Sequence, residues 1–234
     1  MTRDIPVLAV SRRTNEALAK RFGAKLRELP MNLANVDDVT YWLSSDPLRE
    51  FFAGCDVALL INNAGLLEPI GPLQTQDVAS VARAVGVNVG APLMLSAAFV
   101  ASVEAKDRRI LHISSGAGRK AYAGWAIYCA SKAALDHHAR CVALDQTPRL
   151  RICSLAPGVV DTDMQTLIRG TEPEKFPDHP RFVELKRRGD MRTPRDVAPK
   201  LVDYLLAQNF GDEVIAELFG NPGIQPERPI RSRA

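Results

Sequence analysis

Tyr128 and Lys132 are the two residues of this sequence whose types and spacing most directly suggest chemistry. They lie four residues apart in a helical pattern, so both side chains would share one helix face. An ammonium group beside a phenol favours the phenolate, and we expect it to lower the tyrosine pKa from about 10 toward neutrality. Such a tyrosine can exchange a proton with a substrate oxygen. The alternative is an ordinary solvent-exposed pair, which is common on helix surfaces.

Two further groups follow apolar runs that resemble strands. Residues 109–114 end in Ser114-Ser115, and a hydroxyl placed there can hold a carbonyl oxygen and stabilise the charge that develops on it. Residues 56–61 lead into NNAG (residues 62–65), whose small residues let a flat ligand approach the backbone, although the motif is also an ordinary turn. Asn88 lies in an otherwise apolar helix, where its amide can satisfy a local backbone group, or distort the helix and hold a water.

Strands and helices alternate along the chain and must position these groups. The predicted strands are residues 5–11, 25–29, 56–61, 109–114, 151–156 and 213–219. The predicted helices are centred on residues 14–22, 35–53, 75–104, 125–146 and 194–208. Most strands are continuous apolar runs, which is typical of strands covered on both faces. The order therefore predicts an α/β fold with a parallel sheet wrapped by helices.

One segment and one tail fall outside this alternation. Residues 161–192 carry several prolines and many charges, and they follow the end of a strand, where ligands bind in open α/β sheets. This segment is either a mobile lid or a plain surface loop. We expect a single domain over residues 1–220 and a flexible tail over residues 221–234.

Composition excludes several classes of protein. The 234 residues include 30 Lys+Arg and 27 Asp+Glu, a formal net charge of +3, which argues against a nucleic-acid binder. The longest clearly apolar stretch, residues 91–103, is too short to cross a bilayer, so we expect no membrane association. The four cysteines lack CxxC spacing and the four histidines lack ligand spacing. We therefore expect a reducing cytoplasmic location and no metal site.

Taken together, these residues resemble the short-chain dehydrogenase/reductases. That family places a serine thirteen residues before the tyrosine of a YxxxK motif, which Ser115, Tyr128 and Lys132 match, and NNAG, Asn88 and a later Pro-Gly pair match its other motifs. The segments LLINNAG, GWAIYCASKAALD, VALDQTP and LAPGVVDTDMQ are similar to those of sepiapterin reductases and bacterial benzil reductases. The resemblance implies a Rossmann-like, three-layer α/β/α fold with a doubly wound, mostly parallel sheet.

The resemblance also implies roles for these residues in the reduction of a diketone-like or pterin-type carbonyl. Tyr128 would donate the proton, Ser115 would bind the carbonyl, and Asn88 would anchor a proton-relay water. Lys132 would hold the nicotinamide ribose and tune Tyr128. Other cofactor contacts are implied for Tyr128 itself, Asn62, Ala64, Gly65, Pro157, Gly158, Thr162 and Met164. Glu217 falls near an acidic substrate anchor of the sepiapterin reductases, but surface solvation also explains it.

The end of the first predicted strand indicates the cofactor. Arg12 and Arg13 stand where an acidic residue would favour NAD, and two guanidinium groups suit the 2′-phosphate of NADP, so we expect NADP (NADPH). Arg13 aligns better with the phosphate-binding arginine of the family. The two arginines could instead belong to a surface helix. Asn32-Leu33 occupies the place of an Asp-Leu pair beside the adenine, with a charge lost and a hydrogen-bonding side chain kept.

The start of the chain departs from the family. The usual first strand, TGxxxGxG loop and first helix have no counterpart before residue 5, and that strand would lie between residues 5–11 and 56–61. A start codon placed too far downstream or a truncated product would explain this. Two functions stay open: an enzyme, or a non-catalytic binding or regulatory protein of the same fold. The family also implies a homodimer or homotetramer.

Overall fold

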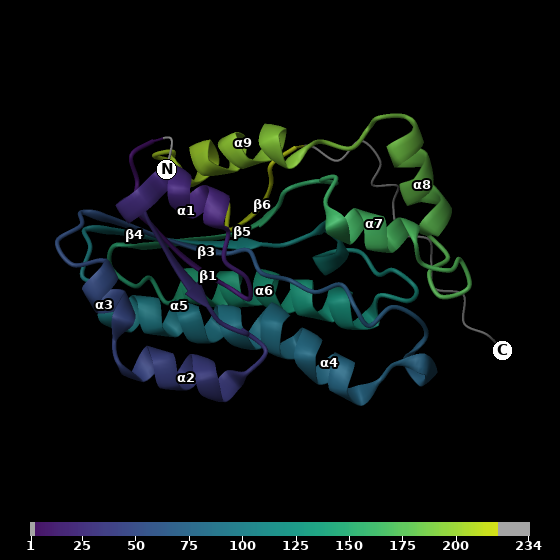
Figure 1. The fold of residues 1–234 in the computed structure, drawn as a ribbon, viewed down its shortest axis with the longest axis horizontal. Coiled ribbons are helices and arrows are strands. Elements are labelled where there is room, and N and C mark those ends of the chain that lie inside the picture. The colour runs from purple at the N-terminus through teal and green to yellow at the C-terminus, as the bar shows by residue number, and fades with distance from the viewer. Residues whose placement is uncertain (1–2, 220–234) are drawn as a thin grey trace.

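The structure, a computed structural model, describes residues 3–219, and the predicted flexible tail lies outside them. Six strands alternate with helices in three layers, as Figure 1 shows. The strands are β1 (Val7–Ser11), β2 (Leu26–Pro30), β3 (Val57–Asn62), β4 (Asp107–Ile113), β5 (Leu150–Ala156) and β6 (Ile215–Glu217). All of their pairings are parallel, which confirms the predicted α/β class.

The strands form two sheets rather than one. β1 pairs with β2, and the second sheet has the order β3-β4-β5-β6. Within residues 3–219 no ladder joins β1 to β3, and these are the two strands between which the family would place its first strand. In the larger sheet Asn62 stands opposite His112, which aligns the carboxyl ends of β3 and β4.

Helices cover both faces of the strands. They are α1 (Glu16–Phe22), α2 (Val36–Ser44), α3 (Pro47–Phe51), α4 (Val78–Val85), α5 (Ala91–Ser102), α6 (Ala126–Leu144), α7 (Asp163–Arg169), α8 (His179–Arg187) and α9 (Pro194–Leu206). In Figure 1, α2, α4, α5 and α6 lie on one side of the strands, and α1 and α9 lie on the other. On the side of the strands that α5 covers, Phe99 of α5 packs with Ala58, Ile110 and Ile152, which come from three different strands.

Local sequence signals set the helix starts. Thr193 caps α9, and its hydroxyl and the Asp196 carboxylate form a capping box around Pro194. Asn15 caps α1 and Asn35 caps α2, in each case by accepting from a backbone N–H of the first turn. The predicted helix over residues 35–53 is two helices, because the chain turns at residues 45–46 before Pro47 starts α3.

The apolar helix from Val78 to Ser102 lies within the predicted helix over residues 75–104 and is longer than the apolar stretch over residues 91–103. It runs through α4, a π-helical turn (Gly86–Gly90) and α5, and by length and composition alone its 25 residues suffice to cross a membrane. The expectation drawn from residues 91–103 was therefore wrong about the length. Ala91 and Phe99 are buried inside the fold, so packing against the strands accounts for the apolar sequence.

Residues 161–192 are an ordered part of the fold. They form α7 and α8, and Phe176 and Phe182 are buried against Trp125. The rings of Trp125 and Phe176 stack with centroids 4.2 Å apart. The description as a plain surface loop is therefore wrong, because aromatic burial fixes this segment against the start of α6.

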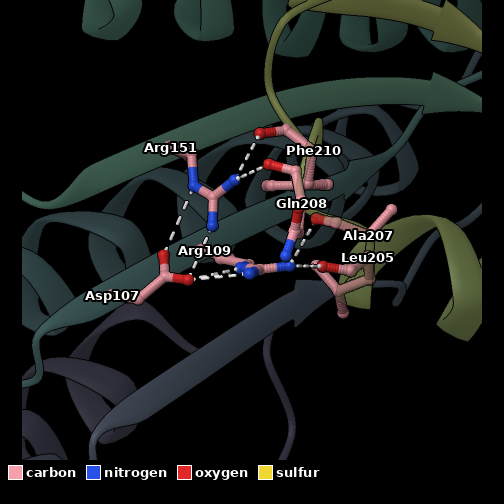
Figure 2. A network of polar contacts seen from close by, with 7 residues as sticks. All are labelled: Asp107, Arg109, Arg151, Leu205, Ala207, Gln208 and Phe210. Atoms are coloured by element: carbon pink, nitrogen blue, oxygen red, sulfur yellow. Dashed lines mark hydrogen bonds and ion pairs between the residues drawn. The ribbon is translucent and has the colours of Figure 1, made fainter.

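A polar network lies at the amino-terminal ends of β4 and β5 (Figure 2). Asp107 at the start of β4 accepts hydrogen bonds from Arg109 and from Arg151 of β5. The two guanidinium groups in turn donate to backbone carbonyls at and just after the end of α9: Arg109 to Leu205 and Ala207, and Arg151 to Gln208 and Phe210. The end of α9 and the following turn are thereby tied to two neighbouring strands.

Candidate active site

A cavity of about 460 Å³ lies at the carboxyl ends of β4 and β5. Ser115, Tyr128 and Lys132 all line it, so the structure brings together the three residues that the sequence spacing selected. Residues of β4, β5, β6, α6, α7, α8 and α9 and of the loop after β3 form the walls. This is the place where open α/β sheets bind ligands.

Tyr128 and Lys132 lie on the buried face of α6. The exposed fraction of Tyr128 is 7% and that of Lys132 is 4%, so neither belongs to an ordinary solvent-exposed pair. The Lys132 ammonium donates to the Ile113 carbonyl at 2.8 Å and lies 5.6 Å from the centre of the Tyr128 ring. The last residues of β4 therefore set the position of the lysine.

Ser115 follows β4 and begins a tight turn (Gly116–Gly118) against α6. Its Oγ accepts from the Ala117 backbone N–H at 3.2 Å, and its hydroxyl also forms a hydrogen bond that favours the Tyr128 phenolate. Ser114 points elsewhere, because its hydroxyl donates to the buried Asp136. The structure thus gives Ser115 the place beside the phenol, in agreement with the thirteen-residue spacing.

The pKa of Tyr128 corrects the sequence prediction. Burial raises it to about 12, and the hydrogen bond from Ser115 only partly opposes this. The prediction of a near-neutral pKa was wrong because it considered the lysine charge and not the loss of water around the phenolate. Burial also lowers the pKa of Lys132 to about 8, against the opposing charge of Asp136. The neutral phenol is therefore the dominant form near pH 7.

Asn88 is fully buried within the π-helical turn, so the predicted helix distortion is present. Its Oδ1 accepts from the Leu66 N–H at 2.7 Å, and its Nδ2 donates to the Leu66 carbonyl at 2.8 Å. These two bonds fix the backbone that follows NNAG. The side chain thus satisfies a local backbone group, and its predicted role in anchoring a proton-relay water stays a prediction.

A second cavity, of about 310 Å³, adjoins the first. Asn63 and Gly65 line both cavities. Arg12, Asn32, Leu33 and Ala64, four of the predicted cofactor residues, line the second one. Arg12 and Arg13 are both exposed, and Arg12 is the one of the two that lines this cavity, so the preference for Arg13 stays a prediction.

The two asparagines of NNAG have different surroundings, and Asn62 does not line the cavities where it was predicted to contact the cofactor. The Asn62 amide lies in the core, where its Nδ2 donates to Ser96 Oγ at 3.2 Å and to His112 Nδ1 at 3.0 Å. Asn62 is thus a structural residue. Asn63 lines the two cavities in the place that was predicted for Asn62. At Gly65 a Cβ atom would stand 3.6 Å from Lys132 Nζ and 3.7 Å from Asn88 Oδ1, which shows how closely the backbone approaches the site.

The remaining predicted residues line the first cavity. They are Pro157, Gly158, Thr162, Met164 and Glu217. Glu217 is bound by the Arg119 guanidinium at 3.0 Å, so surface solvation does not describe it. Asn32 faces the second cavity, although its Oδ1 already accepts from the Ala34 N–H at 3.2 Å in a local turn.

The sequence profile described as short chain dehydrogenase matches residues 1–173. The chain belongs to the short-chain dehydrogenase family. This confirms the family resemblance and makes the chain an oxidoreductase of a family that uses NAD(P).

Relatives of this short-chain dehydrogenase include two kinds of reductase. A benzil reductase ((S)-benzoin forming) from Bacillus cereus is 36% identical over 156 residues, which cover 64% of this chain and 63% of that protein. A sepiapterin reductase from Bos taurus is 30% identical over 221 residues, covering 87% of this chain and 80% of that protein. The matched region thus spans less than two thirds of the benzil reductase and most of the sepiapterin reductase.

Solved structures agree with the family. A short-chain dehydrogenase/reductase from Burkholderia vietnamiensis is 46% identical, with a TM-score of 0.66, and the match covers 93% of this chain and 87% of that one. The KRED1-Pglu enzyme is 27% identical, with a TM-score of 0.78, and the match covers 90% of this chain and 89% of that one.

Several residues of this short-chain dehydrogenase site were missed in the sequence. Trp125, Tyr122, Arg181 and Phe182 form a wall of the first cavity, and Arg83 adds a second arginine to the other cavity. The aromatic residues lie in GRKAYAGWAIY and in the charged segment 161–192, where neither has a helical or strand period. Trp125, three residues before Tyr128, is the one whose place beside the tyrosine the spacing could have indicated.

Proposed function

We propose that this short-chain dehydrogenase reduces ketones with NADPH, and that its substrates are apolar, aromatic carbonyl compounds such as α-diketones. The observation that carries the proposal is a pair of adjoining cavities that share Asn63 and Gly65. A cationic end lies at Arg12 and Arg83, and a buried Tyr128 beside Ser115 lies at the other end. The names of the benzil reductase relatives support the diketone class.

The second cavity fits the adenosine end of NADPH. Arg12 and Arg83 provide guanidinium groups that suit a 2′-phosphate, and Leu33 gives an apolar wall for the adenine ring. Gly65 keeps the passage to Lys132 open, since a side chain there would enter it. Lys132, Pro157 and Gly158 would then surround the nicotinamide end, where the cofactor supplies the hydride.

The protein's own residues would position the substrate and supply the proton. Ser115 Oγ would donate a hydrogen bond to the substrate carbonyl oxygen, and the Tyr128 hydroxyl would transfer its proton to that oxygen as the carbon gains the hydride. The high pKa of Tyr128 suits this direction, because the phenol is protonated at neutral pH. Lys132 would hold the ribose and stabilise the phenolate that the transfer leaves behind.

The aromatic wall favours a substrate with a flat apolar group. Trp125 and Phe182 line the cavity, and Trp125 meets Tyr128 edge-to-face with ring centroids 5.7 Å apart. An aryl ketone could pack against this wall with its carbonyl directed toward Tyr128 and Ser115. Buried aromatic surface favours apolar ligands more than charged ones.

The test compares Tyr128→Phe with Tyr122→Phe in steady-state assays of NADPH oxidation with benzil. Both tyrosines line the same cavity, but Tyr122 contacts Trp125 and accepts from Arg181 rather than facing Ser115. Loss of the proton donor should lower kcat/KM by about 10²–10⁴-fold, whereas Tyr122→Phe should change it only a few-fold.

Two results would contradict the proposal. Equal activity of the two variants would remove Tyr128 as the proton donor. A folded wild-type chain that binds NADPH yet reduces no member of a panel of diketones and aryl ketones would instead favour a binding protein of the same fold.

A further inference from the structure

Asp136 is a buried carboxylate directly behind the candidate active site. It lies on α6 one helical turn after Lys132 and two turns after Tyr128, and its exposed fraction is 1%. Its Oδ1 accepts from Ser114 Oγ at 2.6 Å and from Ser154 Oγ at 2.7 Å. Its Oδ2 accepts from Arg119 Nε at 3.1 Å. A buried carboxylate without such donors would cost several kcal/mol.

The donors come from both sides of Ser115. Ser114 precedes Ser115, and Arg119 follows the turn that Ser115 begins, so one carboxylate holds both ends of this short segment. Arg119 extends the network to β6, where it donates to the Ala216 carbonyl at 3.2 Å and to Glu217 at 3.0 Å.

The segment has no room to move toward α6. At Gly118 a Cβ atom would stand 2.9 Å from the backbone carbon of Lys132 and 3.1 Å from Asp136 Oδ2. The turn therefore packs directly on the helix backbone at the level of Lys132. The distance between Ser115 and Tyr128 depends on this contact, because the two residues belong to the two elements that meet there.

We propose that Asp136 is a positioning residue of the reaction: its carboxylate fixes the Ser115 segment to the helix that carries Tyr128 and Lys132, and places a negative charge behind the lysine ammonium. The inference rests on the proposed function for its kinetic consequences. Its electrostatic part stands on the structure alone and is measured without turnover.

The charges around the site define what the carboxylate does. Asp136 lies one helical turn after Lys132 and binds the cation Arg119 on the Ser115 segment, and the charge of Lys132 helps to lower the pKa of His112 on β4. Glu217 of β6 binds the far side of Arg119. Asp136 opposes the burial that lowers the pKa of Lys132, and that pKa lies at about 8. Without this anion, nothing would oppose the burial of Lys132, and its pKa would fall further.

Asp136→Asn removes the charge and can keep the hydrogen bonds. The amide oxygen can accept from Arg119, and the amide nitrogen can donate to the hydroxyls of Ser114 and Ser154, which also act as acceptors. The first measurement is the pKa of Lys132 by NMR titration of labelled lysine, assigned with Lys132→Arg. We expect a pKa about one pH unit or more lower in Asp136→Asn than in the wild type.

The second measurement is the pH profile of kcat/KM. The alkaline fall in activity should move to lower pH by the same amount in Asp136→Asn, and activity should approach that of the wild type at acidic pH, where Lys132 is protonated in both proteins. Asp136→Ala also releases the Ser115 segment, so acidic pH should not restore its activity.

Ser154→Ala is the matched control. It removes one hydrogen bond from the same carboxylate but leaves the charge and the Ser115 segment in place. It should lower thermal stability without moving the lysine pKa or the pH profile. An unchanged lysine pKa in Asp136→Asn, or an equal shift in Ser154→Ala, would overturn the inference. A wild type without reductase activity would refute the proposed function, while the NMR titration would still decide the role of Asp136.

Discussion

The titratable side chains His112, Tyr128 and Lys132 are buried close to one another, and burial disfavours the charged form of each. The consequence differs with the chemistry of the group. The phenol stays protonated and can give up a proton, whereas the lysine comes close to losing its charge at about pH 8. A site of this kind needs a buried anion to keep the ammonium charged, which is the place that Asp136 occupies.

His112 should make the protein sensitive to acid. Burial and the neighbouring His138 and Lys132 lower its pKa from 6.5 to about 3 in the folded state. The unfolded chain therefore binds more protons below pH 6.5, so the free energy of unfolding falls as the pH drops from about 6.5 toward 3. At pH 4 this group should cost about 3 kcal/mol relative to pH 7.

Urea unfolding at a series of pH values checks this expectation. His112→Gln removes the titrating group, and its stability should fall less steeply between pH 7 and pH 4 than that of the wild type. His137→Gln, at the exposed neighbour of His138, should follow the wild-type curve. Parallel curves for His112→Gln and the wild type would show that His112 does not control the acid transition.

The site residues were predictable where spacing fixes them. The end of a predicted strand indicated Ser115, and the spacing of one helical turn indicated Tyr128 and Lys132. The structure has that strand end and that helical turn, and all three residues line the first cavity. Asn62 and Asn63 were not separable in the same way, because the exact end of β3 decides which amide faces the core. The pKa of Tyr128 was out of reach, since burial depends on Trp125 and on the packing of residues distant in sequence.

At the scale of elements, the apolar runs and the alternation with helices predicted six strands, and each strand end lies within two residues of its prediction. Charged segments were less informative. α7 and α8 were missed because their sequence is polar at most positions, and a few buried side chains, among them Ile168, Phe176 and Phe182, pack this segment against the fold. Such helices depend on tertiary contacts, which local propensity does not encode.

The end of α9 should depend on Arg109. Its buried guanidinium donates to the carbonyls of Leu205 and Ala207 at 2.6 and 2.9 Å and pairs with Asp107 at 2.7 Å (Figure 2). Arg109→Ala would leave these carbonyls and the carboxylate without that donor. We expect a loss of about 3 kcal/mol in the free energy of unfolding, measured by urea denaturation.

Lys106→Ala is the control for this change. Lys106 also pairs with an aspartate, Asp56, at 2.9 Å, but both side chains are well exposed to water. Water replaces that partner readily, so no measurable loss of stability is expected. Comparable losses in the two variants would mean that burial does not distinguish the two ion pairs.

The molecule as a whole joins a well-packed sheet to a lightly packed one. Four consecutive residues of β4 and five of β5 are buried. Every residue of β1, β2 and α1 keeps at least part of its surface exposed. Val10 packs beside the cluster of Leu33 and Val39, which provides one of the apolar contacts that hold the smaller sheet in place. The second cavity lies where the two sheets meet, with Arg12 on one side and Ala64 and Arg83 on the other.

This asymmetry predicts two levels of protection against hydrogen exchange. Backbone amides of β1 and β2 should exchange through local opening and faster than those of β4 and β5. Their exchange should depend little on low urea concentrations, because little buried surface is exposed when the smaller sheet opens. NADPH bound in the second cavity would contact both sheets and should slow exchange in β1 and β2 selectively. Mass spectrometry of peptic fragments with and without NADPH measures both effects. Equal protection of the two sheets without ligand would contradict the packing argument, and unchanged exchange at saturating NADPH would place the cofactor elsewhere.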